Sequence, residues 1–192
     1  MTPRERPILF SAPMVRALLD GRKTQTRRIV KPQADSIEPH DGYPGEWSPW
    51  KDGERQASIL CPYGVSGDRL WVRETTIIAP KRWNDGYGAT HVDAEGDKRI
   101  VQYLATSPSR DAAKAYNLKA TPTIHMPRWA SRITLELTDV RVHRLLDITE
   151  DDARAEGAEN ARAFVTLWDS INGKGSWDAS PWVWALTFRL AQ

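Results

Sequence analysis

The segment of residues 21–28, Gly-Arg-Lys-Thr-Gln-Thr-Arg-Arg, contains the side chains of this chain that are best suited to chemistry. Lys23 supplies an amine and Thr26 a hydroxyl group, and both are candidate bases or nucleophiles. Guanidinium groups bind phosphate and carboxylate groups through paired hydrogen bonds. We therefore expect this segment to bind a nucleotide or to carry out chemistry on one. Its further candidates for substrate binding are Arg22, Thr24, Arg27 and Arg28.

A second segment, residues 147–159, is acidic where the first is basic. It contains six acidic residues and one basic residue, Arg154, whereas residues 16–31 contain six basic residues and one acidic residue, Asp20. Two such segments in one small fold either pair at the surface, where ion pairs contribute little to stability, or converge on a site.

The alternating segment of residues 69–76 adds three further candidates for substrate binding, and Trp129 is a fourth. Leu70, Val72 and Glu74 lie on one face of the expected strand, and Arg73 lies on the other, so at most one of Arg73 and Glu74 faces a pocket. A carboxylate among apolar neighbours needs a partner. Tryptophan rings can stack on a base, although core packing is their more common role. The four candidates are Trp71, Arg73, Glu74 and Trp129.

The elements that must position these residues are short. The pattern predicts a helix over residues 12–20, ended by Gly21, and a long strand over residues 132–146 with a bulge near Thr138 and Asp139. Thr149 with Asp152 forms a capping box for a helix that ends at Gly157, and Asn160 caps the next helix, which Asn172 and Gly173 end. The other expected strands are residues 8–10, 69–76, 100–104 and 181–190, with an irregular loop over 32–66 and an insertion over 79–127.

This order of elements favours an α+β fold in a single domain, residues 1–192. We expect a half-open antiparallel β-barrel decorated with short helices, because consecutive antiparallel strands must close or cover their edges. A doubly wound parallel sheet fits poorly, since too few crossover helices separate the strands.

Composition narrows the class of protein further. The chain has 192 residues, 40% of them hydrophobic, with a net charge of +2, which is too mild to demand a nucleic-acid partner. It has one cysteine, Cys61, and four scattered histidines, so we expect no disulfide, no metal site and no cofactor. The absence of a signal-peptide pattern and of a long apolar run predicts a cytoplasmic protein without a membrane partner, with a monomer as the default.

Four motifs together resemble the ASCH domain family, whose fold is a PUA-like β-barrel. They are residues 21–27 after a first helix, Gly67-Asp68-Arg69-Leu70 opening a strand, Ala153-Arg154-Ala155-Glu156-Gly157 on a helix, and an aromatic closing strand. The segments 125–132 and 168–172 are similar to the longer ASCH proteins that phages and prophages carry.

The resemblance implies a function directed at nucleobases or nucleic acids. Small bacterial members are amidohydrolases that act on cytidine acetylated at its exocyclic amine, and their motif residues correspond here to Lys23, Thr26 and Glu156. Which of Lys23 and Glu156 acts as base or acid stays open, because a nearby ammonium would lower the carboxyl pKa that acid catalysis needs raised. A non-catalytic module that binds RNA or modified nucleic acid is the alternative, and a ribonuclease is the second alternative. The expected partner is a nucleoside or RNA.

Overall fold

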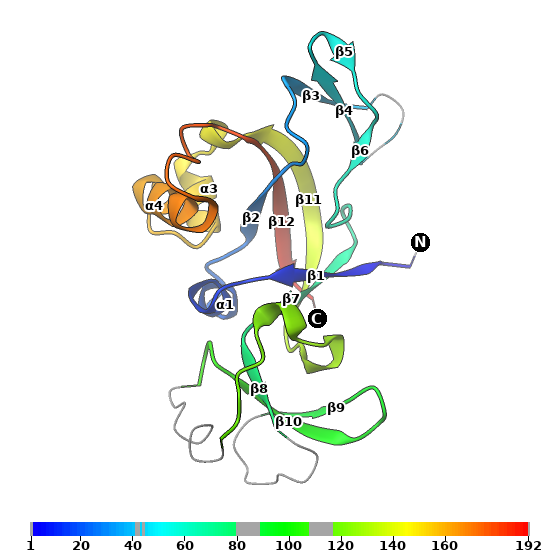
Figure 1. Cartoon of the computed structure of the whole chain (residues 1–192), viewed down its shortest axis with the longest axis vertical. Helices are drawn as coiled ribbons and strands as arrows, with labels where there is room; N and C mark the ends of the chain where they lie inside the picture. The colour runs from blue at the N-terminus through cyan, green and yellow to red at the C-terminus, as the bar shows by residue number, and fades with distance from the viewer. Residues whose placement is uncertain (1, 41–42, 44, 80–88, 108–116, 192) are drawn as a thin grey trace.

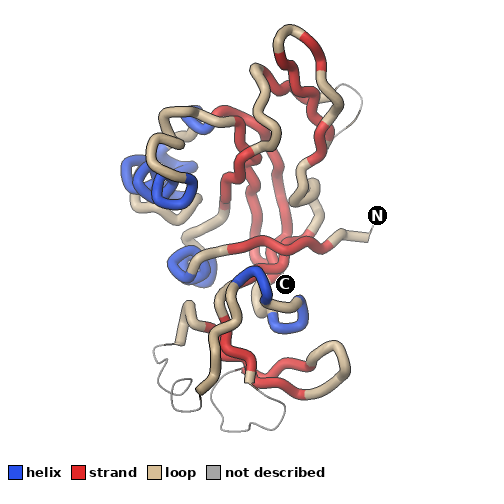
Figure 2. The backbone as a smooth tube through the Cα atoms, in the orientation of Figure 1, coloured by secondary structure: helices blue, strands red, loops and turns tan. Residues whose placement is uncertain are grey.

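A central sheet, two smaller sheets and a few short helices make up the protein (Figures 1 and 2). The computed structural model describes residues 2–40, 43, 45–79, 89–107 and 117–191. In this part of the chain, strands predominate and helices are few, so the expected α+β class is confirmed.

The central sheet has five strands in the order β1-β7-β11-β12-β2. β11 and β12 form its longest pair, and the register between them shifts between Leu137 and Asp139, where the sequence predicts a bulge. The bounds are β1 (Glu5–Leu9), β7 (Arg69–Arg73), β11 (Thr134–Arg144), β12 (Trp182–Leu190) and β2 (Gln25–Ile29).

The expectation of a wholly antiparallel sheet is wrong at one edge. β1 runs parallel to β7, whereas the other pairs in this sheet are antiparallel. A parallel pair needs a long crossover, and the chain between β1 and β7 supplies one. β1 and β2 are the two edges of the sheet, and no strand pairing joins them in the described part of the chain. A side chain bridges them instead, since Arg28 of β2 donates from Nη2 to the carbonyl oxygen of Leu9 at 2.9 Å.

The main hydrophobic core is built largely from side chains of this sheet. Leu70 and Val72 of β7 are fully buried, as alternation predicts, and they pack with Leu135, Leu137 and Leu186 of the neighbouring strands. Burial of such side chains contributes about 1.5–3 kcal/mol each.

The helices α1 (Ala12–Leu19), α3 (Glu150–Ala155) and α4 (Ala161–Asn172) gather on one side of the sheet (Figure 1). The capping box predicted at Thr149 and Asp152 is present, with both reciprocal hydrogen bonds. Asn160 caps α4 as predicted, because its side chain accepts from the backbone N–H of Ala163 at 2.9 Å. Helices this short are marginal alone, so packing stabilises them. Val15 and Leu18 of α1 belong to the first core cluster. Apolar side chains of α3 and α4 form a second cluster with β12, made of Leu145, Ala153, Phe164, Trp168 and Val183.

The prediction of an irregular loop over residues 32–66 is wrong. This segment forms a small sheet at the top of Figure 1. Its strands are short, and β4 contains Pro49 opposite Ile37, so neither length nor alternation marks them in the sequence. They are β3 (Ser36–Pro39), β4 (Glu46–Lys51), β5 (Glu54–Arg55) and β6 (Ile59–Leu60).

The segment 79–127 contains more regular structure than the sequence pattern indicates. The strand expected over residues 100–104 corresponds to β10 (Lys98–Tyr103), which pairs with β8 (Thr76–Ile78) and β9 (Ala89–Val92). Residues 80–88 and 108–116 of this insertion lie outside the described residues. Three short 3-10 helices complete the described elements: η1 (Thr123–His125), η2 (Arg128–Ala130) and η3 (Leu145–Asp147).

Asp68 fastens the N-terminal strand at the start of β7. Its carboxylate accepts hydrogen bonds from the backbone of Arg4 at 2.9 Å, from the backbone of Val65 at 3.2 Å and from Arg6 Nη1 at 2.8 Å. Burial raises the pKa of Asp68, but these hydrogen bonds and the Arg6 charge outweigh burial and leave the pKa below 3.8. The ionised carboxylate therefore stabilises the fold above the unfolded-state pKa, and this contribution is lost as the pH falls through the folded-state pKa.

Replacing this carboxylate by an amide tests that contribution. We predict that Asp68→Asn lowers the free energy of unfolding at pH 7 by about 1–3 kcal/mol, because buried N–H groups lose a charged acceptor. The difference from the native chain should shrink below about pH 4, where the unfolded-state carboxyl group is protonated. Urea unfolding between pH 2 and 7 measures it, with exposed Asp178→Asn as control. A difference that is constant with pH would contradict the assignment.

Candidate functional site

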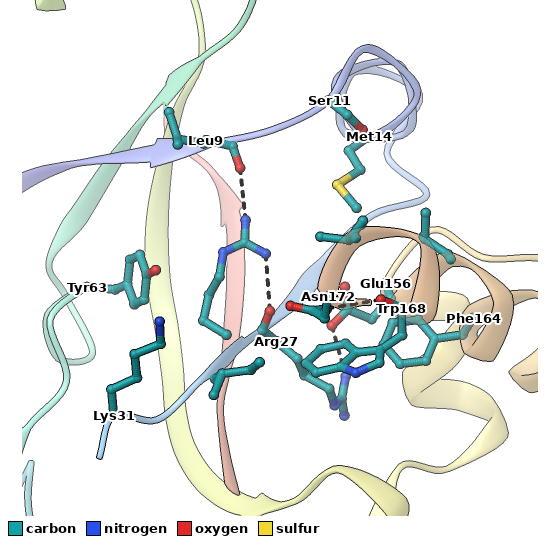
Figure 3. Close-up of a pocket in the computed structure, with 14 residues that line it drawn as sticks. Leu9, Ser11, Met14, Arg27, Lys31, Tyr63, Glu156, Phe164, Trp168 and Asn172 are labelled. Atoms are coloured by element: carbon teal, nitrogen blue, oxygen red, sulfur yellow. Dashed lines mark hydrogen bonds and ion pairs between the residues drawn. The ribbon is translucent and has the colours of Figure 1, made fainter. Parts of the chain in front are cut away.

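A cavity of about 430 Å³ opens beside β2, between α1 and the pair α3 and α4 (Figure 3). This volume is within the range of small-molecule sites in proteins. Glu156 and Arg27 line it, together with apolar side chains of α4 that include Phe164 and Trp168. Arg28 and Lys31 also line the cavity.

Four charged side chains form a group that we call the charge cluster: Lys23, Arg27 and Glu156, which are buried, and Asp152, which is half-buried. Lys23 Nζ lies 2.7 Å from Glu156 Oε2, and these side chains are only 0% and 4% exposed. Arg27 Nη1 lies 3.3 Å from Glu156 Oε1, and Arg27 Nη2 lies 3.2 Å from Asp152 Oδ2. Two cations and two anions therefore neutralise each other, as buried charges must.

Helix α3 presents both carboxylates of the charge cluster. Asp152 and Glu156 are four residues apart and so lie on one face of the helix, where they hold Arg27 between them. The capping box fixes Asp152, because its carboxylate also accepts from the backbone N–H of Thr149. Arg27 is fully buried, and its Nε has no hydrogen-bond partner in the described part of the chain.

The end of α1 and the end of α3 hold Lys23 in place. Its backbone N–H donates to the carbonyl oxygen of Ala17 at 3.0 Å, and the backbone N–H of Thr24 donates to Ala155 at 2.8 Å. Lys23 Nζ also donates to the backbone carbonyl oxygen of Glu156 at 2.7 Å. The segment that joins α1 to β2 is thus fastened to the C-terminus of α3.

Burial changes the pKa of Lys23. Desolvation lowers the pKa of Lys23 below 10.5, and although Glu156 opposes this effect, the positive charges of Arg28 and Arg27 reinforce it. Burial raises the pKa of Asp152, but the Thr149 N–H and the Arg27 charge outweigh it and leave the pKa lowered. The Lys23 ammonium therefore loses its proton more readily than that of an exposed lysine.

Thr26 does not join Lys23 and Glu156 at the cavity. Its hydroxyl group accepts a hydrogen bond from Arg28 Nη1 at 3.0 Å, and the residue is fully buried. It is not among the residues that line the cavity, and no hydrogen bond joins it to Lys23 or Glu156 in the described structure. Lys23 likewise lies behind Glu156 rather than on the cavity surface. Of the three motif residues, Glu156 alone lines the cavity.

The other predicted substrate-binding residues divide into two groups. Arg27 and Arg28 line the cavity, whereas Arg22 and Thr24 are exposed, and Arg22 pairs with Asp20 at 2.9 Å. The three candidates on the expected strand of residues 69–76 and the candidate Trp129 do not line the cavity. These are Trp71, Arg73, Glu74 and Trp129.

Glu74 has the partner that a buried carboxylate needs, and that partner lies away from the cavity. Arg132 donates to it from Nε at 2.8 Å and from Nη2 at 3.0 Å. Arg73 lies over the ring of Trp71 at 4.7 Å, and Trp129 packs against a third apolar cluster. Trp129 and the Arg132 partner of Glu74, which lies over the ring of Tyr103 of β10 at 4.0 Å, therefore stabilise the junction with the β8-β10-β9 sheet.

Several cavity residues are missing from the sequence-based prediction. The spacing of Phe164, Leu167, Trp168 and Ile171 does indicate a shared helical face, but spacing alone does not distinguish a face that covers the core from one that lines a cavity. Ile171 is 58% exposed, which shows that part of this face is left uncovered at the cavity. Lys31 and Tyr63 carry no motif that could have identified them.

Comparisons of the chain with protein-family models, with curated proteins and with solved structures gave no match. The resemblance to the ASCH family therefore rests on the motif residues themselves. Among the described residues, no helix has the length and apolar character needed to cross a membrane. In the same part of the chain, no group of three or more His, Cys, Asp or Glu side chains is arranged to hold a metal ion.

A double-mutant cycle tests whether Lys23 and Glu156 form a buried pair. We predict that Lys23→Met and Glu156→Gln each lower the free energy of unfolding by about 3–5 kcal/mol, because each removes one partner of a buried ion pair. The double variant should lose much less than the sum of the two. Arg22→Met is the control, since its exposed pair with Asp20 is worth about 0–1 kcal/mol. Additive losses in the double variant would contradict a direct pair.

Gly157 provides a second test, because it lets α3 approach Lys23 closely. Its φ is +87°, and a Cβ atom there would lie 3.1 Å from Ala17 Cβ and 3.3 Å from Lys23 Cβ. We predict that Gly157→Ala is less stable than Gly175→Ala by about 1–3 kcal/mol in urea unfolding, owing to overpacking. Gly175 is the matched control, since its φ is +82° and nothing lies within 4 Å. Equal losses would show that backbone strain alone matters at Gly157.

Proposed function

We propose that this protein is a nucleobase- or nucleic-acid-directed hydrolase that removes an acyl group from the exocyclic amine of a cytosine-like base. One observation carries the proposal: Glu156 lines a cavity of about 430 Å³ while Lys23 and Arg27 hold both oxygens of its carboxylate. A fixed carboxylate at a cavity is the arrangement that general acid–base catalysis requires.

The fold supports this proposal through the shape of the central sheet. We take it to be a PUA-like barrel of the ASCH type, with β1 and β2 as its open seam. The hydrogen bond from Arg28 to Leu9 spans that seam, and Arg28 itself is held by Thr26. Arg28 thus lies both at the seam and at the cavity.

The chemistry needs one water molecule for each amide bond. In the proposed step, the water oxygen bonds to the acyl carbon, and Glu156 takes one proton from that water. The bond between the acyl carbon and the exocyclic nitrogen then breaks, and Glu156 returns the proton to this nitrogen. The products are a carboxylic acid and the free amine. Lys23 and Arg27 orient the carboxylate and stay outside the bonds that form and break.

This assignment gives Thr26 a positioning role. Its hydroxyl group is buried and accepts a hydrogen bond from Arg28, so it does not reach a bound acyl group from that position. The same observation favours a second candidate, which is a module that binds RNA or modified nucleic acid without turnover. In that candidate, the charge cluster only shapes the pocket.

An absorbance assay with N4-acetylcytidine separates the two candidates. We predict that the native chain hydrolyses it and that Glu156→Gln lowers kcat/KM by about 10²–10⁴-fold, which is the usual contribution of a general acid–base group. Glu159→Gln is the matched control, because Glu159 is exposed on the loop after α3 and should retain full activity. Thr26→Val should lose less than Glu156→Gln, since it acts through Arg28.

A folded native chain without hydrolysis would overturn the enzymatic proposal. Titration of labelled RNA at increasing salt would then test the binding module, because displacement of counterions makes such binding weaken with salt.

A further inference from the structure

The charges at the cavity do not balance once the charge cluster is set aside. Arg27 and Glu156 neutralise each other together with Lys23 and Asp152. Arg28 and Lys31 also line the cavity, and neither has a carboxylate partner in the described part of the chain. Two positive charges are therefore left facing the cavity.

Arg28 is held in place by neutral oxygen atoms. It donates to Thr26 Oγ1 at 3.0 Å, to the Arg27 carbonyl oxygen at 3.1 Å and to the Leu9 carbonyl oxygen at 2.9 Å. A guanidinium group has five N–H bonds, so donors remain for a ligand. The three contacts fix the orientation of the group without neutralising its charge, and a preorganised cation binds an anion with little reordering.

Lys31 lies on the side of the cavity away from the charge cluster. Figure 3 shows its amine pointing toward Tyr63, whereas Glu156, Trp168 and Phe164 lie on the other side. The cavity thus has a cationic end near Lys31 and a carboxylate with apolar walls at the other end. Such a division suits a ligand with a charged group at one end and a flat, largely apolar group at the other.

We propose that Arg28 and Lys31 form a subsite for a terminal phosphate, so that the ligand is a nucleotide rather than a free nucleoside. A phosphate monoester carries a charge of about −1.5 to −2 near pH 7, which two cations match. An internal phosphodiester carries one charge and leaves the second cation unmatched. This inference rests on the proposed function, because it takes the other end of the cavity to receive the base.

Calorimetric titration of cytidine and of cytidine 5′-monophosphate tests the subsite without any need for turnover. We expect the native chain to bind the monophosphate about 10-fold or more tightly than cytidine, as charge-assisted hydrogen bonds contribute at least that difference. In Lys31→Gln, the ratio of the two dissociation constants should fall toward one. Lys51→Gln removes a lysine of β4 that is also exposed and is not among the residues that line this cavity, so it should keep the native ratio.

Three results would overturn the subsite. They are equal affinity of the native chain for the two ligands, an unchanged ratio in Lys31→Gln, and an equal loss in both lysine variants. The last measurement is the affinity of the native chain for a cytidine trinucleotide that has no terminal phosphate. If it binds as tightly as the monophosphate, the subsite recognises internal phosphodiesters and the assignment to a terminal phosphate is wrong. Preference for the monophosphate in a chain that does not hydrolyse N4-acetylcytidine would remove the hydrolase proposal and leave the subsite standing.

Discussion

The burial of Lys23 and Arg27 constrains the rest of this structure, because neither cation can leave water without a carboxylate partner. Asp152 lies in α3, which is only six residues long, and Glu156 caps its C-terminus, more than a hundred positions further along the chain. Three features bring Asp152 and Glu156 to β2. They are the capping box, the close approach at Gly157 and the docking of α3 on the sheet. Without these ion pairs, burying the two cations would be unfavourable, and the segment that joins α1 to β2 would stay exposed to water.

The same pairs divide the charged side chains of the cavity into two classes. The charge cluster is neutral and largely buried, so it orients Glu156 without attracting a ligand from a distance. Arg28 and Lys31 are held by neutral groups or by none, so their charges remain available to a ligand. A hydrolase of acylated bases would use the first class for chemistry and the second for binding, which explains why one small cavity needs both.

The sequence predicted features that depend on local geometry. The capping box at Thr149, the cap at Asn160 and the bulge after Leu137 follow from nearest neighbours, and each is confirmed. The sequence also indicated that the basic and acidic segments could meet, because their charges are complementary, and the ion pairs of Lys23 and Arg27 with Asp152 and Glu156 join them. The positions of Thr26 and Glu74 could not be predicted, since a strand pattern identifies a face but not which neighbour covers it. The short strands over residues 32–66 were missed because they lack both length and alternation.

The most direct test of the buried ammonium is to observe it by side-chain ¹H–¹⁵N NMR of the lysines, with the Lys23 signal assigned by its loss in Lys23→Met. Solvent exchange of lysine ammonium protons is slow only where the group is buried and hydrogen-bonded. We predict one signal with much slower exchange than the exposed lysines, because Lys23 Nζ donates to two oxygens of Glu156 and is fully buried. A Lys23 signal that exchanges as fast as those of the surface lysines would contradict the buried pair and, with it, the proposed site.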